Sequence, residues 1–184
     1  ESKESEVIYE DDKVTVSTIP LNHRVYTNGF LFQEKVGNRH LNIEAVAKYK
    51  IEKCYFDKIK QGGNVTLDSG EVIENDLLSF PPDATKSYAF CSDTMYDESI
   101  VPLIKEVDVL YHESTFLDSE QQYTEKTKHC TAKEAAKIAK LANVKQLILG
   151  HYSTRYGSIE PFKTEAETVF DNVLLADDGR EFEF

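Results

Sequence analysis

The sequence lacks the marks of a membrane or secreted protein. No apolar run approaches the roughly 20 residues that a membrane span needs. The first six residues, Glu-Ser-Lys-Glu-Ser-Glu, are too charged for the apolar segment of a signal peptide. We therefore expect no membrane association. An initiator Met is also missing, so we expect a piece of a longer protein.

Cysteine is sparse and unpaired in spacing. The chain has three cysteines, Cys54, Cys91 and Cys130, and no two of them form a CxxC pair. Zinc fingers need such pairs, so this class of metal site is excluded. An odd, scattered set predicts reduced thiols and a cytoplasmic location.

An overall excess of positive charge is missing too. Lys and Arg number 21 against 33 Asp and Glu, which gives a net charge of −12 and counts against a nucleic-acid partner. Between Lys35 and Lys60, however, seven basic residues face three acidic ones. This stretch is either a local contact for nucleic acid or an ordinary solvated helix face.

What remains is the composition of a globular domain. The 184 residues are 40% hydrophobic, enough to bury a core in one domain. Apolar spacing and turn residues predict, in order, two strands within 7–19, a strand from 30, a helix within 42–60, a hairpin at 65–73, a strand at 87–91, a helix at 99–105, a strand at 107–111, a helix at 132–142 capped by Thr131, a strand at 147–149, a helix at 161–170 and a strand from 173. This order predicts an α/β domain with a mixed sheet.

Three apolar runs each end on a side chain that can bind a metal. They end at His23, Asp93 and His151. The carboxyl ends of strands lie on the rim of a sheet, where ligands collect in α/β folds. Imidazole and carboxylate together suit zinc or a similar divalent ion, and a carboxylate can bridge two ions. The alternative is that each residue is only a capped strand end.

Other polar residues lie in similar positions. His112 follows the strand at 107–111, and His129 precedes the helix at 132–142, where it could transfer a proton near neutral pH. Ser153 and Arg155, just after His151, would suit a bound phosphate. The alternatives are a neighbour of the helix cap for His129 and a salt bridge for Arg155.

Together these segments resemble a known family. Pro-Leu-x-His-x5-Gly at 20–29, Ser-Asp-Thr at 92–94, His-Glu-Ser-Thr-Phe at 112–116, His-Cys-Thr-Ala at 129–132 and His-x-Ser-x-Arg-Tyr at 151–156 are similar to the motifs of ribonuclease Z. This family of tRNA 3′-processing endonucleases belongs to the metallo-β-lactamase superfamily. The resemblance implies an αβ/βα sandwich with two zinc ions at the sheet rim, and a homodimer.

The resemblance also implies roles for individual residues. His23 would bind the first zinc ion, Asp93 would bridge both and His151 would bind the second. His129 would be the catalytic histidine that assists the leaving oxygen. The implied reaction is attack by a metal-activated hydroxide on the phosphodiester of precursor tRNA, which leaves a 3′-hydroxyl on the tRNA.

Four further residues match the family's motifs around the site. His112 and Glu113 correspond to a loop that shapes the site, and Ser153 and Arg155 would contact the RNA backbone.

Two departures from the family are visible. The His-x-His-x-Asp-His motif, which supplies the other ligands, is absent from all 184 residues. We therefore expect residues 1–184 to be the carboxyl-terminal half of the domain and predict that the chain alone binds little or no zinc and is inactive. The Gly-Pro-rich signature of the family's tRNA-binding exosite arm is also absent, and residues 35–62 stand in its place as a reduced arm.

Two alternatives remain open. A weakened arm would favour a phosphodiesterase of the same superfamily that acts on small substrates. A non-catalytic scaffold or dimerisation half is the second alternative, although a scaffold has no physical need for His129, His151 and Asp93 together.

Overall fold

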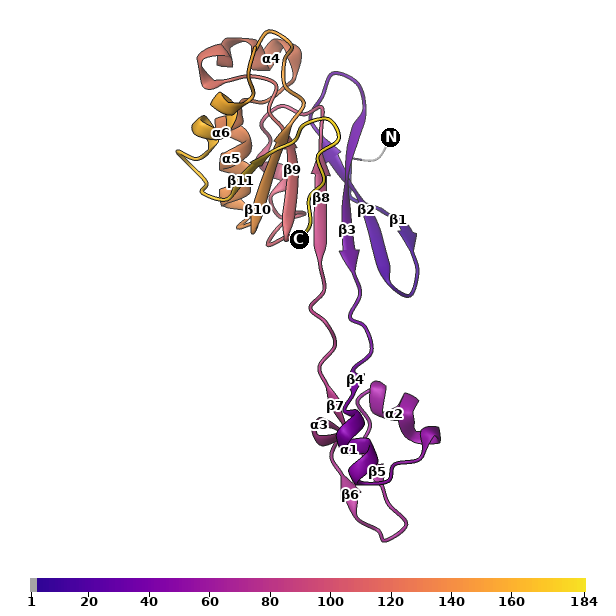
Figure 1. Cartoon of the computed structure of the whole chain (residues 1–184). Coiled ribbons are helices and arrows are strands. Elements are labelled where there is room, and N and C mark those ends of the chain that lie inside the picture. Colours follow the sequence, from indigo (N-terminus) through magenta and orange to yellow (C-terminus); the bar gives the residue numbers. More distant parts are fainter. Residues whose placement is uncertain (1–2) are drawn as a thin grey trace. The chain divides into compact units, whose positions relative to one another are not determined.

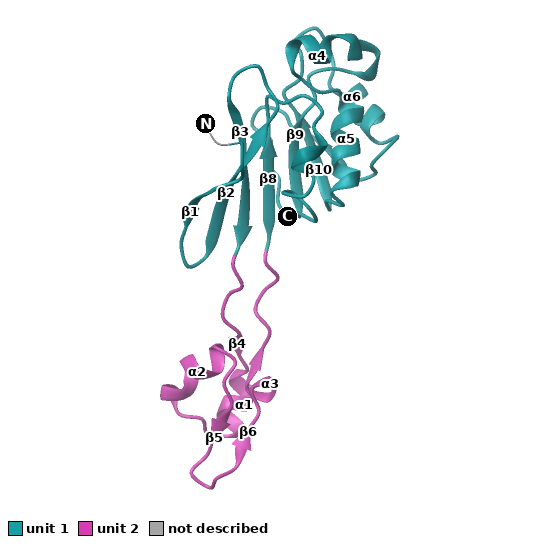
Figure 2. Cartoon of the chain, turned by 180° about the vertical axis from the view of Figure 1, so that it is seen from behind, with its two compact units in different colours: residues 1–34, 86–184 teal, residues 35–85 magenta. Residues whose placement is uncertain are grey.

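The computed structural model describes residues 3–184, which form two compact units (Figures 1 and 2). Unit 1 contains the described residues up to Glu34 together with Lys86–Phe184, and unit 2 contains Lys35–Thr85. None of the described helices is long and apolar enough to span a membrane.

Unit 1 is built on a mixed sheet of seven strands in the order β1-β2-β3-β8-β9-β10-β11. Their bounds are β1 Val7–Glu10, β2 Val14–Leu21, β3 Thr27–Glu34, β8 Ser87–Cys91, β9 Val109–Glu113, β10 Gln146–Gly150 and β11 Val173–Leu175. The pairs from β1 to β8 are antiparallel, and those from β8 to β11 are parallel. The predicted mixed sheet and its strands are confirmed.

Helices cover one face of this sheet (Figure 1). The covering helices are α5 (Ala132–Leu141) and α6 (Glu160–Ala166), and the 3₁₀ turn η2 (Glu98–Ile100) contacts β2. The 3₁₀ turn η3 (Asp118–Tyr123) and the short helix α4 (Thr124–Thr127) pack on each other, and α4 lies at the top end of the sheet in Figure 1. The core forms where α5 and α6 meet the sheet, and Ile138, Leu147, Leu149 and Phe162 are fully buried there. Burial of such apolar side chains is the main stabilising force of the unit.

Two helix predictions for unit 1 have different outcomes. The helix at 132–142 is confirmed as α5, and Thr131 caps it in a full capping box with Glu134. The helix at 99–105 is wrong, because only the single turn η2 forms, followed by irregular turns. Pro102 lies in this segment and has no N–H to donate to a helical hydrogen bond.

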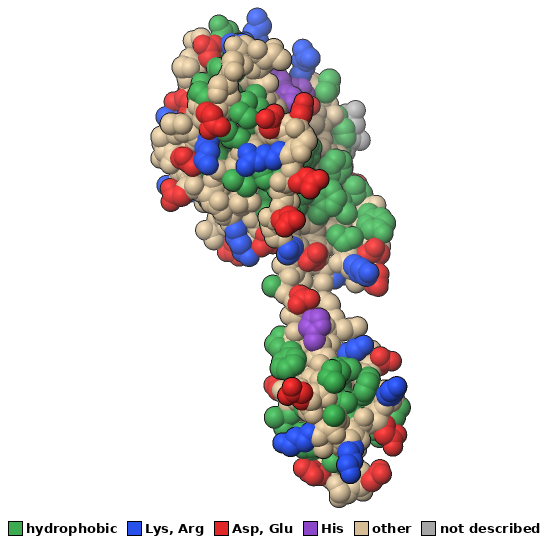
Figure 3. Space-filling view, in the orientation of Figure 1, with side chains coloured by type: hydrophobic (Ala, Val, Ile, Leu, Met, Phe, Trp, Pro, Cys, Tyr) green, Lys and Arg blue, Asp and Glu red, His purple; other side chains and the backbone are tan. Residues whose placement is uncertain are grey.

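The opposite face of the sheet carries aromatic side chains. The rings of Phe90 and Tyr111 stack at 4.8 Å, and those of Phe32 and Tyr88 stack at 5.9 Å. Burial raises the pKa of Tyr88 to about 12. Edge strand β1 also exposes hydrophobic side chains, and Figure 3 shows such side chains gathered on the part of unit 1 around β1–β3. Exposed apolar area of this kind is typical of an interaction surface.

Unit 2 has a small core of its own. Its elements are β4 (His40–Leu41), α1 (Ile43–Lys48), the 3₁₀ turn η1 (Lys53–Tyr55), α2 (Phe56–Lys60), β5 (Val65–Thr66), β6 (Val72–Ile73), α3 (Asn75–Leu78) and β7 (Ser79–Phe80). The buried residues are Val46, Ile51, Ile59, Val65, Ile73 and Leu78. The predicted hairpin at 65–73 is confirmed as the β5–β6 pair.

The single helix predicted within 42–60 is wrong, because the segment divides into α1, η1 and α2. Lys50 has a φ of 54°, which is not helical, and the chain reverses there. The reversal lets Ile51 reach the same core as Val46 and Ile59. The arm predicted at 35–62 is therefore part of a larger unit, and its role stays a prediction.

Candidate metal centre

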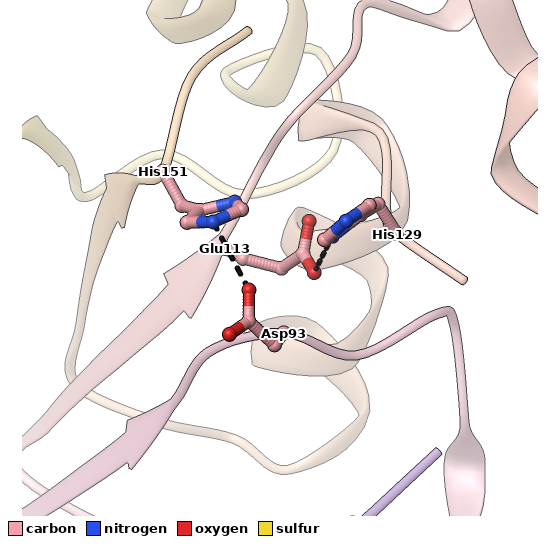
Figure 4. Close-up of side chains that lie close together, drawn as sticks. All are labelled: Asp93, Glu113, His129 and His151. Carbon is pink, nitrogen blue, oxygen red and sulfur yellow. Dashed lines mark hydrogen bonds and ion pairs between the residues drawn. The ribbon is translucent and has the colours of Figure 1, made fainter. Parts of the chain in front are cut away.

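Parallel pairing brings metal-capable side chains to one edge of the sheet. Asp93 follows β8, Glu113 ends β9 and His151 follows β10, and these three strands are neighbours in parallel. His129 joins them from the loop between α4 and α5. One ligand atom from each of these four residues lies within 4.8 Å of the others (Figure 4). The predicted meeting of Asp93 and His151 is thus present in the structure.

The backbone around this group is strained. Asp93, Lys128 and His151 have φ values of 60°, 62° and 59°. These values lie in the left-handed region, which residues other than glycine rarely adopt. Such strain costs roughly 1–3 kcal/mol per residue and is common at functional sites. In this site the strained residues are Asp93 and His151, which belong to the cluster, and Lys128, which directly precedes His129.

Glu113 holds the residues of this group in place through hydrogen bonds. Its side chain is fully buried. Oε1 accepts hydrogen bonds from Thr94 N–H (2.7 Å) and His129 Nδ1 (2.7 Å), and Oε2 accepts from the Thr115 hydroxyl (2.6 Å) and Cys130 N–H (3.1 Å). Burial raises the pKa of Glu113, but the hydrogen bonds from His129 and Thr115 outweigh it, and the pKa is lower than usual. Glu113 is therefore a buried anion whose lone pairs are already in use.

This anion fixes the tautomer of His151. The Thr115 hydroxyl has one proton, which it donates to Glu113, so it accepts the Nδ1 proton of His151 at 2.9 Å. In the neutral ring, Nε2 then carries the lone pair. Nε2 lies 3.0 Å from Asp93 Oδ1, so a nitrogen and an oxygen ligand face one another.

His129 is fixed in the same way. Its Nδ1 donates to Glu113, and this hydrogen bond raises the pKa of His129. The rings of His129 and His151 stack with centroids 5.1 Å apart. His129 therefore presents Nε2 away from the buried carboxylate, and its raised pKa keeps it protonated at a higher pH than an ordinary histidine.

His23, the third predicted ligand, lies beside this group. It follows β2, and its Nδ1 donates to the backbone carbonyl of Lys128 at 3.0 Å. Its ring centroid is 5.1 Å from that of His129. The cluster within 4.8 Å contains Glu113 and His129 instead of His23, so the role of His23 as a ligand stays a prediction.

The donor set fits a divalent metal ion. His23 and His151 each use Nδ1 in a hydrogen bond to an oxygen, the arrangement that orients histidines for metal binding through Nε2. The Asp93 carboxylate adds oxygen ligands. Glu113 fits a supporting role better than a direct ligand, because its oxygens already accept hydrogen bonds.

The other residues singled out in the sequence are held by protein contacts. His112 is fully buried; its Nδ1 bonds to the Glu113 carbonyl (2.8 Å), Nε2 has no partner, and burial lowers its pKa. Arg155 contacts Glu120 (2.9 Å) and Ser153 Oγ (3.2 Å). Its guanidinium also lies over the rings of Phe116 and Tyr123, at 5.1 Å from each. The site-shaping role of His112 and Glu113, which are both fully buried, and the RNA contacts of Ser153 and Arg155 stay predictions.

Sequence reasoning missed two residues of the site. Thr94 and Thr115 both bond Glu113, and Thr115 also orients His151. Both lie inside motifs already noted in the sequence, Ser-Asp-Thr at 92–94 and His-Glu-Ser-Thr-Phe at 112–116, and this was the signal that could have identified them. The carboxylate to which they donate hydrogen bonds depends on the order of the strands in the sheet, and local sequence does not reveal that order.

Comparison with known proteins shows what this chain is similar to. The chain is 42% identical over 172 residues to ribonuclease Z of Phocaeicola vulgatus, covering 94% of this chain and 56% of that protein. It is 42% identical over 184 residues to ribonuclease Z of Cytophaga hutchinsonii, covering 99% and 58%. This chain is a homologue of ribonuclease Z. It spans slightly more than half the length of these relatives, and no protein-family model matches it.

Solved structures show the fold of this ribonuclease Z homologue. The metallo-β-lactamase fold protein YhfI of Bacillus subtilis matches with a TM-score of 0.61 and 18% identity, covering 95% of this chain and 51% of that chain. The short form of human tRNase Z matches with 0.54 and 22%, covering 95% and 44%. A long-form RNase Z from yeast matches with 0.59 and 20%, covering 93% and 18%. The chain has about half of a metallo-β-lactamase fold, as predicted.

Proposed function

We propose that the full-length protein containing this chain is a zinc-dependent endoribonuclease that removes the 3′ trailer from precursor tRNA. The observation that carries the proposal is the cluster of Asp93, Glu113, His129 and His151 at one sheet edge, in a chain whose relatives are named ribonuclease Z. Nitrogen and carboxylate ligands suit zinc.

In this proposal each residue has a distinct task. His23, Asp93 and His151 would hold the metal, with the Asp93 carboxylate shared between the two ions. A bound zinc ion supplies Lewis-acid stabilisation of the charge on a phosphodiester. Glu113 holds His129 with Nε2 toward the reacting group, and the raised pKa keeps His129 able to donate a proton to the departing 3′-oxygen.

Two further parts of the proposal follow because the chain spans only slightly more than half the length of its relatives. The isolated chain is expected to be inactive, because three ligands are too few for two zinc ions. The open aromatic face of the sheet is where the remainder of the domain would complete the αβ/βα sandwich. The homodimer and the cytoplasmic location stay predictions.

A small-molecule phosphodiesterase is the second candidate. The observation in its favour is the charge of unit 2, where seven basic residues are offset by eight acidic ones over residues 35–85. A unit without net positive charge provides little long-range attraction for tRNA. The local basic excess between Lys35 and Lys60 favours the tRNA substrate.

One experiment separates these functions. The full-length protein is assayed with precursor tRNA and with bis(p-nitrophenyl) phosphate, as wild type, as Asp93→Ala and as Asp12→Ala, a control in an exposed turn. We expect trailer removal by wild type and control, and no cleavage or bound zinc with Asp93→Ala. Hydrolysis of the small ester alone would favour the second candidate. Full activity of Asp93→Ala would refute the site itself.

A further inference from the structure

A cavity of about 500 Å³ opens beside the metal centre. Its wall runs from Pro20 at the end of β2 through the connecting loop to Thr27 at the start of β3, and it also includes Lys3, Asp97 and Ser99 of η2. His23 belongs both to this wall and to the neighbourhood of the centre, where its ring lies 5.1 Å from that of His129. A ligand held at the centre could therefore extend into the cavity.

Two cations lie near His23. Arg24 lies in the cavity wall and is exposed, and it is close enough to His129 to lower the pKa of that ring in part. Lys128 lies outside the cavity wall, but its carbonyl accepts the hydrogen bond of His23, and its ammonium lies 3.3 Å from the sulfur of Met95. A thioether is a weak acceptor, so this ammonium keeps capacity for a stronger anionic partner.

The cavity wall also presents an aromatic ring. Tyr26 is 48% exposed, and its hydroxyl accepts a hydrogen bond from Asn28 Nδ2 at 3.0 Å, which helps to orient the ring. Its neighbour Val25 is 62% exposed and adds apolar surface. An exposed aromatic ring next to cations is the combination that binds single-stranded nucleic acid, through base stacking and phosphate contacts.

We propose that this cavity is a nucleotide subsite, in which Tyr26 stacks on a base next to the scissile phosphate while Arg24 and Lys128 contact the adjoining phosphates. The inference rests on the proposed function, because it needs a polynucleotide at the metal centre. Asp97 also belongs to the wall and repels phosphate, so the nucleotide backbone is expected to lie nearer Arg24. The nucleotide is either the last of the tRNA or the first of the trailer.

The test combines substitutions of Tyr26 with precursor tRNA substrates that lack one base. The full-length protein is compared as wild type, Tyr26→Ala, Tyr26→Phe and Tyr9→Ala, a control at a tyrosine of similar exposure on β1. Each cleaves precursor tRNA that is intact, abasic at the last tRNA nucleotide, or abasic at the first trailer nucleotide. Stacking on one base is worth about 1–3 kcal/mol, so Tyr26→Ala should raise KM for intact substrate about tenfold, with Tyr26→Phe and Tyr9→Ala near wild type.

The abasic substrates decide the outcome. With the base that stacks on Tyr26 removed, wild type and Tyr26→Ala should have the same KM, and the substrate that shows this identifies the nucleotide. A KM unaffected by Tyr26→Ala on intact substrate would overturn the subsite, and so would a penalty that persists on both abasic substrates. The proposed function fails separately, if wild type does not cleave precursor tRNA.

The phosphate contacts are tested separately, through KM and the salt dependence of tRNA binding. Arg24→Gln and Lys128→Gln should each raise KM for precursor tRNA and make the salt dependence of binding shallower by about one counterion. An unchanged salt slope in both variants would remove the phosphate contacts from the proposal.

Discussion

Glu113 shows how a single buried charge can order a whole site. It receives four short hydrogen bonds, one from each of Thr94, Thr115, His129 and Cys130. An isolated buried carboxylate would cost several kcal/mol, but one with these donors is stabilised as an anion. The anion in turn fixes the ring orientation of His129 directly and that of His151 through Thr115.

The Glu113–His129 pair should give stability a defined pH dependence. The lowered pKa of Glu113 adds stability that is complete above its ordinary value of 4.5 and is lost as pH falls through the native value. The raised pKa of His129 adds stability that is complete below its ordinary value of 6.5 and is lost as pH rises through the native value. Both contributions to stability are therefore complete only between pH 4.5 and pH 6.5.

The measurement is urea unfolding of the full-length protein in chelator, as wild type and as Glu113→Gln. We expect Glu113→Gln to lower the free energy of unfolding by about 2–3 kcal/mol near pH 5.5. The difference should shrink toward pH 9 and toward pH 3. A difference that does not change with pH would contradict the charge pairing.

Thr115 should control metal affinity without being a ligand. Thr115→Val keeps the shape of the side chain but removes the hydroxyl that orients His151, so zinc affinity should fall by roughly 10–100-fold. Thr115→Ser keeps the hydroxyl and should stay near wild type. Thr127→Val, at a half-buried threonine of α4 whose hydroxyl donates to the Tyr123 carbonyl, is the control for loss of a hydroxyl elsewhere. Titration calorimetry would show whether the affinity depends on the hydroxyl, and equal affinities for Val and Ser would exclude this role.

At the scale of elements, the start of α5 positions the proton donor. His129 lies two residues before the N-cap Thr131, and the intervening Cys130 donates its backbone N–H to Glu113. The sequence predicted Thr131 as the cap because it directly precedes an amphipathic helix, and the structure adds Glu134, the third residue of the helix, as the other half of a capping box. The cap therefore couples a local sequence signal to the geometry of the site.

Breaking this cap should affect both stability and catalysis. Thr131→Ala should lower the free energy of unfolding by about 1 kcal/mol and reduce kcat for precursor tRNA, because the backbone at Cys130 loses its anchor. Thr131→Ser should restore both values. Thermal unfolding and steady-state kinetics provide the check, and a stability loss with an unchanged kcat would show that the cap does not position His129.

At the scale of the whole molecule, unit 2 should be separable from unit 1. Its two connections lie on adjacent strands, where Glu34 N–H bonds to the Lys86 carbonyl at 2.9 Å and Gln33 pairs with Ser87. A two-residue Asn-Gly turn can therefore replace residues 35–85 and close β3 onto β8 as a hairpin. Because each unit has its own core, unit 1 should keep its fold.

This excision tests the arm prediction. In the full-length protein it should leave hydrolysis of bis(p-nitrophenyl) phosphate within about twofold of wild type. The kcat/KM for precursor tRNA should fall about 100-fold, or ~2.7 kcal/mol. Circular dichroism and metal content serve as controls for folding. Equal retention of both activities would mean that unit 2 does not bind tRNA.

The sequence by itself determined the strands, the capped helix α5 and the metal-capable residues at strand ends, because these depend on local spacing of apolar and polar side chains. It also contained the motifs shared with ribonuclease Z. Local spacing misled where chain reversal and core burial competed with helix formation, as at Lys50 and Ile51.

Only the tertiary structure decided how those residues meet. Strands β8, β9 and β10 are separated by long connections, and their parallel order alone brings Asp93, Glu113 and His151 to one edge. The same order buries Glu113 and directs Thr94, Thr115 and His129 onto it. Hydrogen bonding between groups distant in sequence carries no local signal, so the tautomers and pKa values of the site follow from the fold.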